Sequence, residues 1–239
     1  MTLLRAALVW LALAPGAEAA CRQALALGLD VSGSVDAREY RLQLDGLAAA
    51  LGEEAVRAAL LEAPGPPVRL AVYEWSGPTD QRLLLPWTEI ADAGVLAEVQ
   101  ARLRRTVRAR AEPTTAIGAA MLYGGRLLAG QEVCWARTLD LSGDGKSNTG
   151  PRPERVDAAQ LPPGVTVNAL VIGAEAEVAG RRQLAEIGEL VAYFQAVVVR
   201  GPGAFVEVAL GFEDYAAAME RKLLRELASL PMGKHGGDL

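Results

Sequence analysis

Short apolar segments alternate with amphipathic segments along most of this chain, and this alternation limits the folds that are open to it. Three apolar runs, residues 24–31, 68–75 and 165–172, have the length of buried strands. Between them, apolar residues recur every three to four positions, as on the buried face of a helix. Strands that alternate with helices predict an α/β fold with a doubly wound, mostly parallel central sheet and helices on both faces.

The same patterns predict the individual elements. A helix begins at Asp36, which forms a capping-box pattern with Glu39, and its apolar stripe continues to Leu51. We expect one domain over residues 21–231, followed by a disordered tail at 232–239. The other predicted strands are 82–85 (a short antiparallel edge strand), 137–141 and 196–199, and the other predicted helices are 92–108, 115–128, 181–190 and 212–227.

The first twenty residues have the layout of a secretory signal peptide. Arg5 precedes an apolar stretch over residues 6–14, and the small-residue pattern of residues 17–19 follows. We therefore expect a bacterial protein that is exported to the periplasm or secreted, with no transmembrane segment in the mature chain. A buried first helix is the alternative. Lipid attachment at Cys21 is disfavoured because Glu18 stands where an aliphatic residue is needed.

Histidine and charge content exclude several classes of function. His235, in the glycine-rich tail, is the only histidine, so a Ser-His-Asp triad, a Cys-His pair or a histidine-based zinc site has no histidine to use. The formal net charge is -5, with acidic and basic residues mixed along the chain, which argues against nucleic acid as the main partner.

Oxygen-bearing side chains follow two of the predicted strands. Asp30, Ser32 and Ser34 come after the first strand, Asp144 follows a later one, and Thr115 opens a helix. Ligands of such sheets bind at the carboxyl ends of the strands, so we expect these five residues to meet at one edge. Two carboxylates and three hydroxyls suit Mg²⁺, Mn²⁺ or Ca²⁺ rather than zinc or copper.

Three motifs resemble those of a known family. The run Asp30-Val31-Ser32-Gly33-Ser34 resembles the D-x-S-x-S signature of von Willebrand factor A (VWA) domains and their metal-ion-dependent adhesion site (MIDAS). Residues 115–118 and 141–145 resemble the second and third elements of that site, in the family's order. The resemblance implies a Rossmann-like VWA fold over essentially the whole mature chain. The Ser-Gly-Asp-Gly run, the two cysteines and the segment 201–208 are similar to a bacterial family of exported VWA-like proteins of unknown function.

The resemblance also implies a division of roles at the metal. Ser32 and Ser34 would bind the cation directly, Thr115 would do so when the site is liganded, and Asp30 and Asp144 would act largely through bound water. A glutamate or aspartate of an unidentified protein partner would take an open position on the ion. The implied function is a non-enzymatic, adhesion-type binding module.

Two departures from the family pattern concern these ligands. Gly143 separates Ser142 from Asp144, where most VWA domains read Thr-Asp-Gly. The usual Gly-Gly before the threonine is Pro113-Thr114, so Thr114 is an alternative to Thr115.

Other interpretations of these residues exist. Asp30 and the run 143–148 also resemble haloacid-dehalogenase-like phosphatases, but the acid/base position of those enzymes is Ser32 here, and a serine cannot transfer that proton near neutral pH. A third interpretation of the chain is a structural domain in which the metal only stabilises the loops at the edge of the sheet. Five arginines between residues 102 and 110 favour a solvated helix face over a docking patch for an acidic partner.

The two cysteines are expected to form a disulfide. Cys21 lies nine residues before Asp30, and Cys134 lies ten residues before Asp144. If both strands end at the metal edge as parallel neighbours, both cysteines begin at the opposite edge, close enough to bridge.

Overall fold

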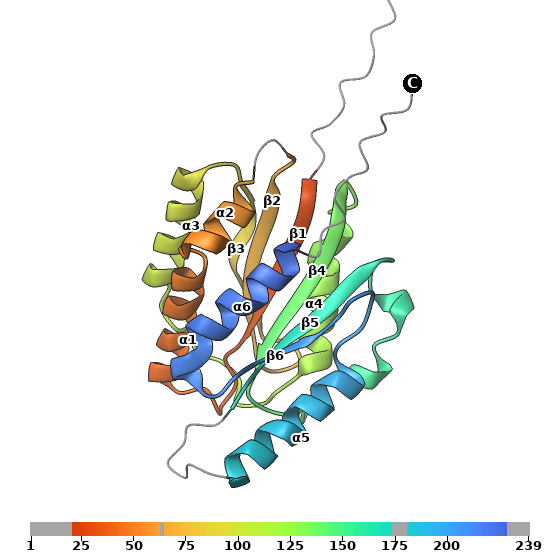
Figure 1. Ribbon diagram of the computed structural model, residues 1–239. Coiled ribbons are helices and arrows are strands. Elements are labelled where there is room, and N and C mark those ends of the chain that lie inside the picture. Colours follow the sequence, from red (N-terminus) through yellow and green to blue (C-terminus); the bar gives the residue numbers. More distant parts are fainter. Residues whose placement is uncertain (1–20, 63–64, 174–180, 229–239) are drawn as a thin grey trace, which may run out of the picture.

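The computed structural model describes residues 21–62, 65–173 and 181–228. A six-stranded sheet with the order β3-β2-β1-β4-β5-β6 forms the centre (Figure 1). Neighbouring strands are parallel except for β2 and β3, which are antiparallel. The strands are β1 (Cys21–Asp30), β2 (Val68–Trp75), β3 (Gln81–Ile90), β4 (Cys134–Gly143), β5 (Val165–Ile172) and β6 (Val206–Ala209).

Helices cover both faces of this sheet. The first apolar core lies under α1 (Ala37–Ala50), α2 (Glu54–Leu60), α3 (Ala93–Arg105) and α6 (Tyr215–Ala228). The second lies under α4 (Ile117–Ala129) and α5 (Arg181–Val197). Three short 3₁₀ helices, η1 (Pro153–Arg155), η2 (Ala158–Gln160) and η3 (Phe212–Asp214), complete the elements.

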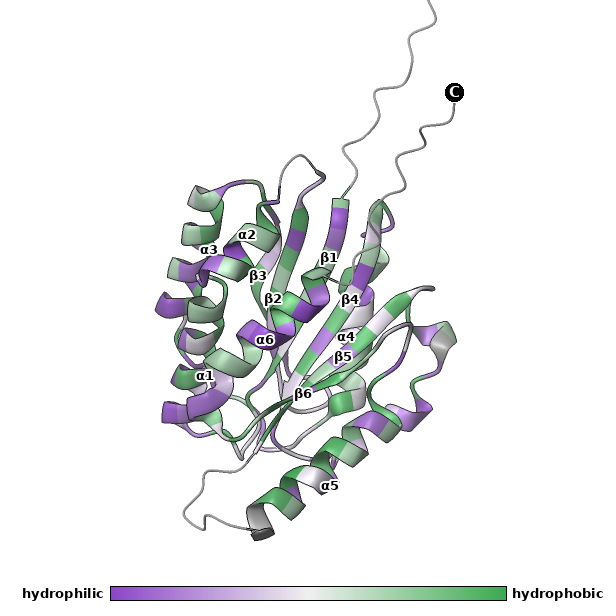
Figure 2. Cartoon of the chain, in the orientation of Figure 1, coloured by the Kyte–Doolittle hydropathy of each residue, from purple (hydrophilic) through white to green (hydrophobic). Residues whose placement is uncertain are grey.

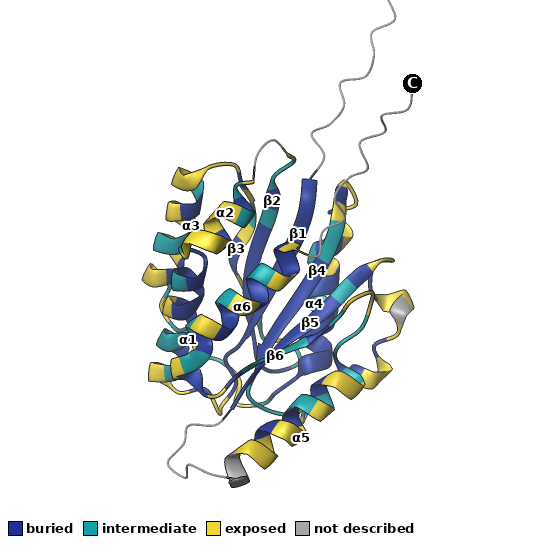
Figure 3. Cartoon of the chain, in the orientation of Figure 1, coloured by how far each residue is buried: buried dark blue, intermediate teal, exposed yellow. Residues whose placement is uncertain are grey.

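Strand β1 shows how the sequence produces these two cores. Every residue of β1 is buried, and alternate side chains enter opposite cores: Leu25 and Leu27 one, Ala24 and Ala26 the other. The helices combine hydrophilic and hydrophobic residues (Figure 2), and the four inner strands, β2, β1, β4 and β5, are buried along most of their length (Figure 3). The predicted doubly wound fold is confirmed.

The two ends of β1 and β4 carry different chemistry. Cys21 pairs with Cys134 in the parallel register, with their Cα atoms 4.2 Å apart, and the predicted disulfide joins them. At the other end the pairing reaches Leu29 and Ser142, so Asp30 and Asp144 leave the sheet on the same edge. The disulfide and the candidate site therefore lie at opposite ends of the same two strands.

The prediction of the last strand was wrong. Residues 196–199 are not a strand: α5 continues to Val197, and the sixth strand is β6. Phe194 and Val198 are both fully buried and lie four residues apart, so they line one side of the helix and the turn after it. Gly201 and Gly203, both with positive φ, then turn the chain toward β6.

The edge strand β3 is longer than the predicted segment 82–85. Pro86 was expected to end it, but β3 passes through this residue. Leu85 pairs with Val72 and Thr88 with Leu70, so two residues of β3 face one residue of β2 in a bulge. A proline is tolerated there because the missing backbone N–H is not needed at a bulge of an edge strand.

Other boundaries differ by a few residues, and one helix was missed. Helix α2 was not predicted. Helix α3 ends at Arg105 rather than at residue 108, so Arg108 and Arg110 follow the helix instead of lying on its face. Thr115 precedes α4, which begins at Ile117.

Two predicted segments, residues 1–20 and 232–239, lie outside the described residues. None of the described helices combines the length and the apolar character that a bilayer crossing requires.

Candidate metal centre

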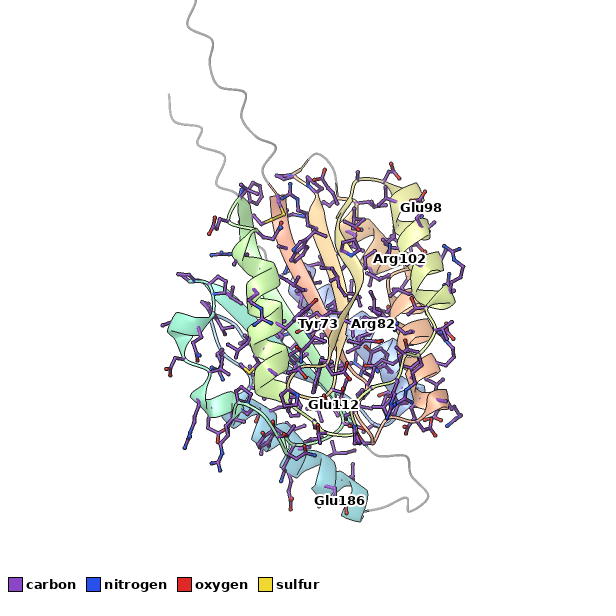
Figure 4. All side chains as sticks on the ribbon, turned by 180° about the vertical axis from the view of Figure 1, so that it is seen from behind. Tyr73, Arg82, Glu98, Arg102, Glu112 and Glu186 are labelled. Atoms are coloured by element: carbon purple, nitrogen blue, oxygen red, sulfur yellow. A yellow bond between two sulfur atoms is a disulfide. The ribbon has the colours of Figure 1, made fainter. Side chains whose placement is uncertain are left out.

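The turn between β1 and α1 places the first three predicted ligands. Asp30 ends β1, and its Oδ1 accepts the backbone N–H of Ser32 at 2.8 Å. The N–H of Gly33 donates to the carbonyl of Pro113 at 3.1 Å, and a Cβ on this glycine would lie 2.9 Å from that oxygen. Only glycine therefore allows the segment that carries the threonines to lie against this turn. Glu112, just before Pro113, lies toward the end of the sheet opposite the disulfide (Figure 4).

The five predicted ligand residues form one connected cluster of oxygens. The Oγ of Ser32 lies 3.3 Å from the Oγ of Ser34 and 3.3 Å from the Oγ1 of Thr115. The Ser34 hydroxyl donates to Oδ1 of Asp144 at 2.7 Å. Three separate stretches of the chain thus meet at the edge where β1 and β4 end.

The cluster is buried on one side and open on the other. Asp30, Ser32 and Thr115 are buried, Asp144 is half-buried, and Ser34 is exposed. A ligand can therefore reach the cluster only from the side of Ser34 and Asp144.

The two carboxylates are poor in compensating charge. Burial, together with the nearby Asp144 carboxylate, raises the pKa of Asp30 to about 7, and burial raises the pKa of Asp144. No lysine or arginine among the described residues forms an ion pair with either group. The Oδ2 of Asp30 is buried and has no hydrogen-bond partner. The fold therefore holds negative charge here that its own side chains do not neutralise.

The cluster fits a hard divalent cation. All of its donors are oxygens, as Mg²⁺, Mn²⁺ and Ca²⁺ prefer, and a cation would supply a partner for the orphan Oδ2 of Asp30. No group of three or more His, Cys, Asp or Glu side chains in the described ranges is placed to hold a metal ion. A metal bound at this cluster would therefore depend on the serine and threonine hydroxyls.

The two candidate threonines differ in their contacts. The hydroxyl of Thr115 donates to Ser32, whereas the hydroxyl of Thr114 is buried without a hydrogen-bond partner. Of the two side chains, only that of Thr115 contacts the cluster among the described residues, which favours Thr115 as the ligand.

Several supporting residues were not predicted. The Gln43 side chain donates to the carbonyl of Asp30 at 2.9 Å. Asn148 and Thr115 exchange two hydrogen bonds, each of 2.9 Å, and the Ser147 hydroxyl donates to the Thr115 carbonyl at 3.2 Å. The sequence gives a hint of Gln43, because it is a polar residue among the apolar positions of α1. In the structure this residue is fully buried. The sequence gives no such hint of Asn148 and Ser147, because they lie in a loop.

The strand order, the helices on both faces and the position of the oxygen cluster define the class of the protein as a von Willebrand factor A fold. Three solved structures share it at low sequence identity. They are proximal thread matrix protein 1 (PTMP1) of the mussel byssus with a zinc-occupied MIDAS motif (18% identity, TM-score 0.58, 88% of this chain and 49% of that one), a von Willebrand factor type A protein from Catenulispora acidiphila (16%, 0.53, 87% and 43%) and the vWF domain of the type V pili tip protein Mfa5 from Porphyromonas gingivalis (10%, 0.55, 91% and 99%).

The chain belongs to the family described as "Protein of unknown function (DUF1194)", whose profile matches residues 20–231. It spans about half or less of the first two of these structures and nearly all of the third. No curated protein has a significantly matching sequence.

Proposed function

We propose that this protein is an exported, metal-dependent binding module whose protein partner supplies a carboxylate to a bound divalent cation. Ser32, Ser34 and Thr115 would hold Mg²⁺, or Mn²⁺ or Ca²⁺ in its place, through their hydroxyls. Asp30 and Asp144 would act largely through bound water and would offset the ion's charge. The partner is a protein with an exposed glutamate or aspartate.

One observation carries this proposal: the oxygen cluster is open to solvent and holds two carboxylates with which no lysine or arginine of the described residues forms an ion pair. The ion would supply positive charge at that opening, and because its directly bound ligands would be neutral hydroxyls, it could still attract a further anion. A carboxylate from outside is the ligand that such an ion attracts most strongly. The protein itself would hold the hydroxyls in position and would exclude bulk solvent from the buried side of the cluster.

Two of the similar structures support the proposal by analogy. PTMP1 has a structure with a zinc-occupied MIDAS motif, and Mfa5 is a pilus tip protein. Export rests on residues 1–20, which we propose are a signal peptide that directs the protein to the periplasm or the exterior. The disulfide between Cys21 and Cys134 suits an oxidising compartment.

A binding role is favoured over catalysis by the residues of the cluster. The position that would carry a phosphatase's acid/base carboxylate is Ser32, and its hydroxyl already contacts Ser34 and Thr115. Turnover of a generic phosphoester that disappears in Asp30→Asn would overturn this preference.

The proposal is tested first by calorimetric titration with Mg²⁺ and Mn²⁺. The wild type should bind one ion, and Asp30→Asn should bind at least about tenfold more weakly because a carboxylate is lost. The matched control is Asp45→Asn, which removes an exposed carboxylate that pairs with Arg41 on α1. This control should bind the ion as the wild type does.

A capture experiment from the cell envelope then tests partner binding. Immobilised wild type and Asp45→Asn should retain a partner in Mg²⁺ and release it in EDTA, whereas Asp30→Asn should retain none. Retention that neither chelation nor Asp30→Asn changes would contradict the adhesive role. If metal binding raises the thermal stability but no partner is captured, a metal that only stabilises the domain explains the results better than a binding role.

A further inference from the structure

A cavity of about 310 Å³ lies beside the candidate metal centre. We call it the side pocket. Its walls come from the chain that follows Asp144, within residues 147–154, and from Tyr193 on α5. A volume near the lower end of the roughly 300–1,000 Å³ range of ligand pockets fits one side chain rather than a large molecule.

The side pocket and the metal centre share a wall. Asn148 donates its backbone N–H to the carbonyl of Thr115, and its Oδ1 accepts the backbone N–H of the same residue. The hydroxyl of Ser147 also donates to the Thr115 carbonyl. The backbone of Thr115, a proposed metal ligand, therefore positions this wall of the pocket. A molecule bound at the metal would lie next to the pocket.

The pocket walls are held in place before any ligand arrives. A Cβ on Gly118 of α4 would lie 2.1 Å from the carbonyl oxygen of Pro151, so this wall lies directly against the helix. Gly150 has a φ of 70° and turns the chain between Pro78 and Ala116. Such a pocket binds without first ordering its own loop, which lowers the entropic cost of binding.

Hydrogen-bond donors dominate the lining of the side pocket. Asn148 uses its Oδ1 on the backbone of Thr115, which leaves its amide hydrogens to donate. The hydroxyl of Tyr193 accepts the N–H of Ser147 at 3.3 Å and keeps its own proton to donate. Arg152 is largely exposed, and the carboxylate of Glu154, which also lines the pocket, lies 3.9 Å from it, at the limit of an ion pair. An amide, a hydroxyl and a loosely paired guanidinium favour a carboxylate as occupant.

We propose that the side pocket is a second subsite, which takes a carboxylate side chain from the same partner whose first carboxylate completes the metal site. This inference rests on the proposed function, because the first carboxylate anchors the partner. The partner segment then carries two acidic residues a short distance apart, one for the cation and one for Arg152, Asn148 and Tyr193.

The probes for this test are capped glycine-serine peptides in Mg²⁺, with either one glutamate or two glutamates separated by zero to three residues. Binding is measured by NMR titration of the full mature chain. The one-glutamate peptide measures the metal site alone. At one spacing or more, the two-glutamate peptide should bind about threefold to tenfold more tightly, as expected for a partly exposed charge-assisted contact. The added shifts should fall on the amides of residues 147–154.

Three variants separate the pocket from nonspecific attraction. Arg152→Gln should abolish the gain from the second glutamate and leave the one-glutamate affinity unchanged. Tyr193→Phe should reduce the gain, because it removes the hydroxyl and keeps the ring. The matched control is Arg155→Gln, an exposed arginine three residues further on that does not line the pocket, and it should keep the full gain.

The outcomes distinguish the two proposals. If the one-glutamate peptide binds but no spacing binds more tightly, or if Arg152→Gln keeps the gain, the side-pocket proposal is overturned and the proposed function stands. If the one-glutamate peptide shows no Mg²⁺-dependent binding, the proposed function fails and the second subsite fails with it.

Discussion

Two clusters of buried acid lie close together along β4 and the turn after it, and they are neutralised in different ways. Asp140 faces α6, where the Nζ of Lys222 lies 2.7 Å from its Oδ2 and 2.6 Å from the Oε1 of Glu226. Asp144, four residues later, lies near Asp30, and within the described ranges no lysine or arginine forms an ion pair with either carboxylate. Burial is the main cause that raises the pKa of both Asp30 and Asp140 to about 7. The second cause differs: Lys222 lowers the pKa of Asp140, and Asp144 raises that of Asp30.

We take this difference to distinguish a structural cluster from the proposed ligand site. The fold encloses its own cation between β4 and α6, and Asn168 completes the arrangement with a hydrogen bond of 2.8 Å to Glu226. At the edge of the sheet it gathers carboxylates and hydroxyls, and no lysine or arginine of the described residues forms an ion pair with these carboxylates. We interpret the first cluster as part of the core and the second as a receptor for an external ion.

The largest effect is expected from removing the internal cation. Lys222→Met removes the cation that pairs with both Asp140 and Glu226 in the core, which should destabilise the protein by about 3–5 kcal/mol. Urea unfolding of the disulfide-intact protein measures this. Lys146→Met, which removes an exposed lysine with a loose partner at 3.8 Å, is the matched control and should stay within about 0.5 kcal/mol of the wild type.

A triple variant tests the reason for that loss. Adding Asp140→Asn and Glu226→Gln to Lys222→Met removes the uncompensated charge and should recover a large part of the stability. A triple variant no more stable than Lys222→Met would show that lost packing of the lysine stem, rather than buried charge, causes the defect.

In the cluster of Asp30 and Asp144 at the edge of the sheet, removing a charged group should instead stabilise the protein when no divalent ion is present. The pKa of Asp30 is raised to about 7 in the folded protein from 3.8, so between these values the folded state holds a proton that the unfolded state has lost. Its contribution to stability therefore falls as the pH rises through this window. In EDTA at pH 8, Asp30→Asn should be more stable than the wild type by about 4 kcal/mol, and at pH 4 the two should be nearly equal.

Paired unfolding measurements of wild type and Asp30→Asn across pH 4–8 in EDTA check this sign. Their difference cancels the other titrating groups, which the two proteins share. A variant that is less stable than the wild type at pH 8 would mean that Asp30 is already compensated within the protein.

The divalent ion itself should act on one cluster only. At a concentration about a hundredfold above its dissociation constant, Mg²⁺ should stabilise the wild type by about 2.7 kcal/mol, which raises Tm by roughly 5–10 °C. Asp30→Asn should gain little. Lys222→Met should gain as much as the wild type, because its defect lies in the other cluster. Calorimetric scans with and without Mg²⁺ test this, and an equal gain in all three proteins would place the ion elsewhere.

The sequence was informative where a buried strand leads into a polar turn. The segments that became β1 and β4 have strand length, and Asp30 and Asp144 lie at or just after their ends, so the strands and the meeting of their ends could be predicted together. The register that joins Cys21 to Cys134 followed from the same two strands. Local pattern and overall fold agree at these positions, which is why prediction succeeded there.

It was less informative where a short apolar run suits two structures. Residues 196–199 were predicted as a strand, and three of the four are valine, which is β-branched; however, Phe194 and Val198 belong to the buried side of α5 and its final turn. Lys222 and Glu226 resemble an ordinary exposed pair spaced by four residues, and only the position of Asp140 beneath α6 shows that they are buried. No sequence pattern indicated the side pocket, because its residues come from a loop and from a helix that is distant in the sequence.

The smallest effect on stability should come with a clear effect on binding. Ser34 is exposed, and its hydroxyl makes one short hydrogen bond to Asp144. Without a divalent ion, Ser34→Ala should therefore change the free energy of unfolding by no more than about 0.5 kcal/mol. With the ion, the lost hydroxyl is a lost ligand, and the affinity for Mg²⁺ should fall by about tenfold or more. Ser147→Ala removes a hydroxyl that lies nearby but bonds to backbone, and it should leave most of that affinity intact. Calorimetric titration of both variants decides the matter: equal affinities would remove Ser34 from the metal site, whereas a loss confined to Ser34→Ala would separate the cluster's ligands from its supports.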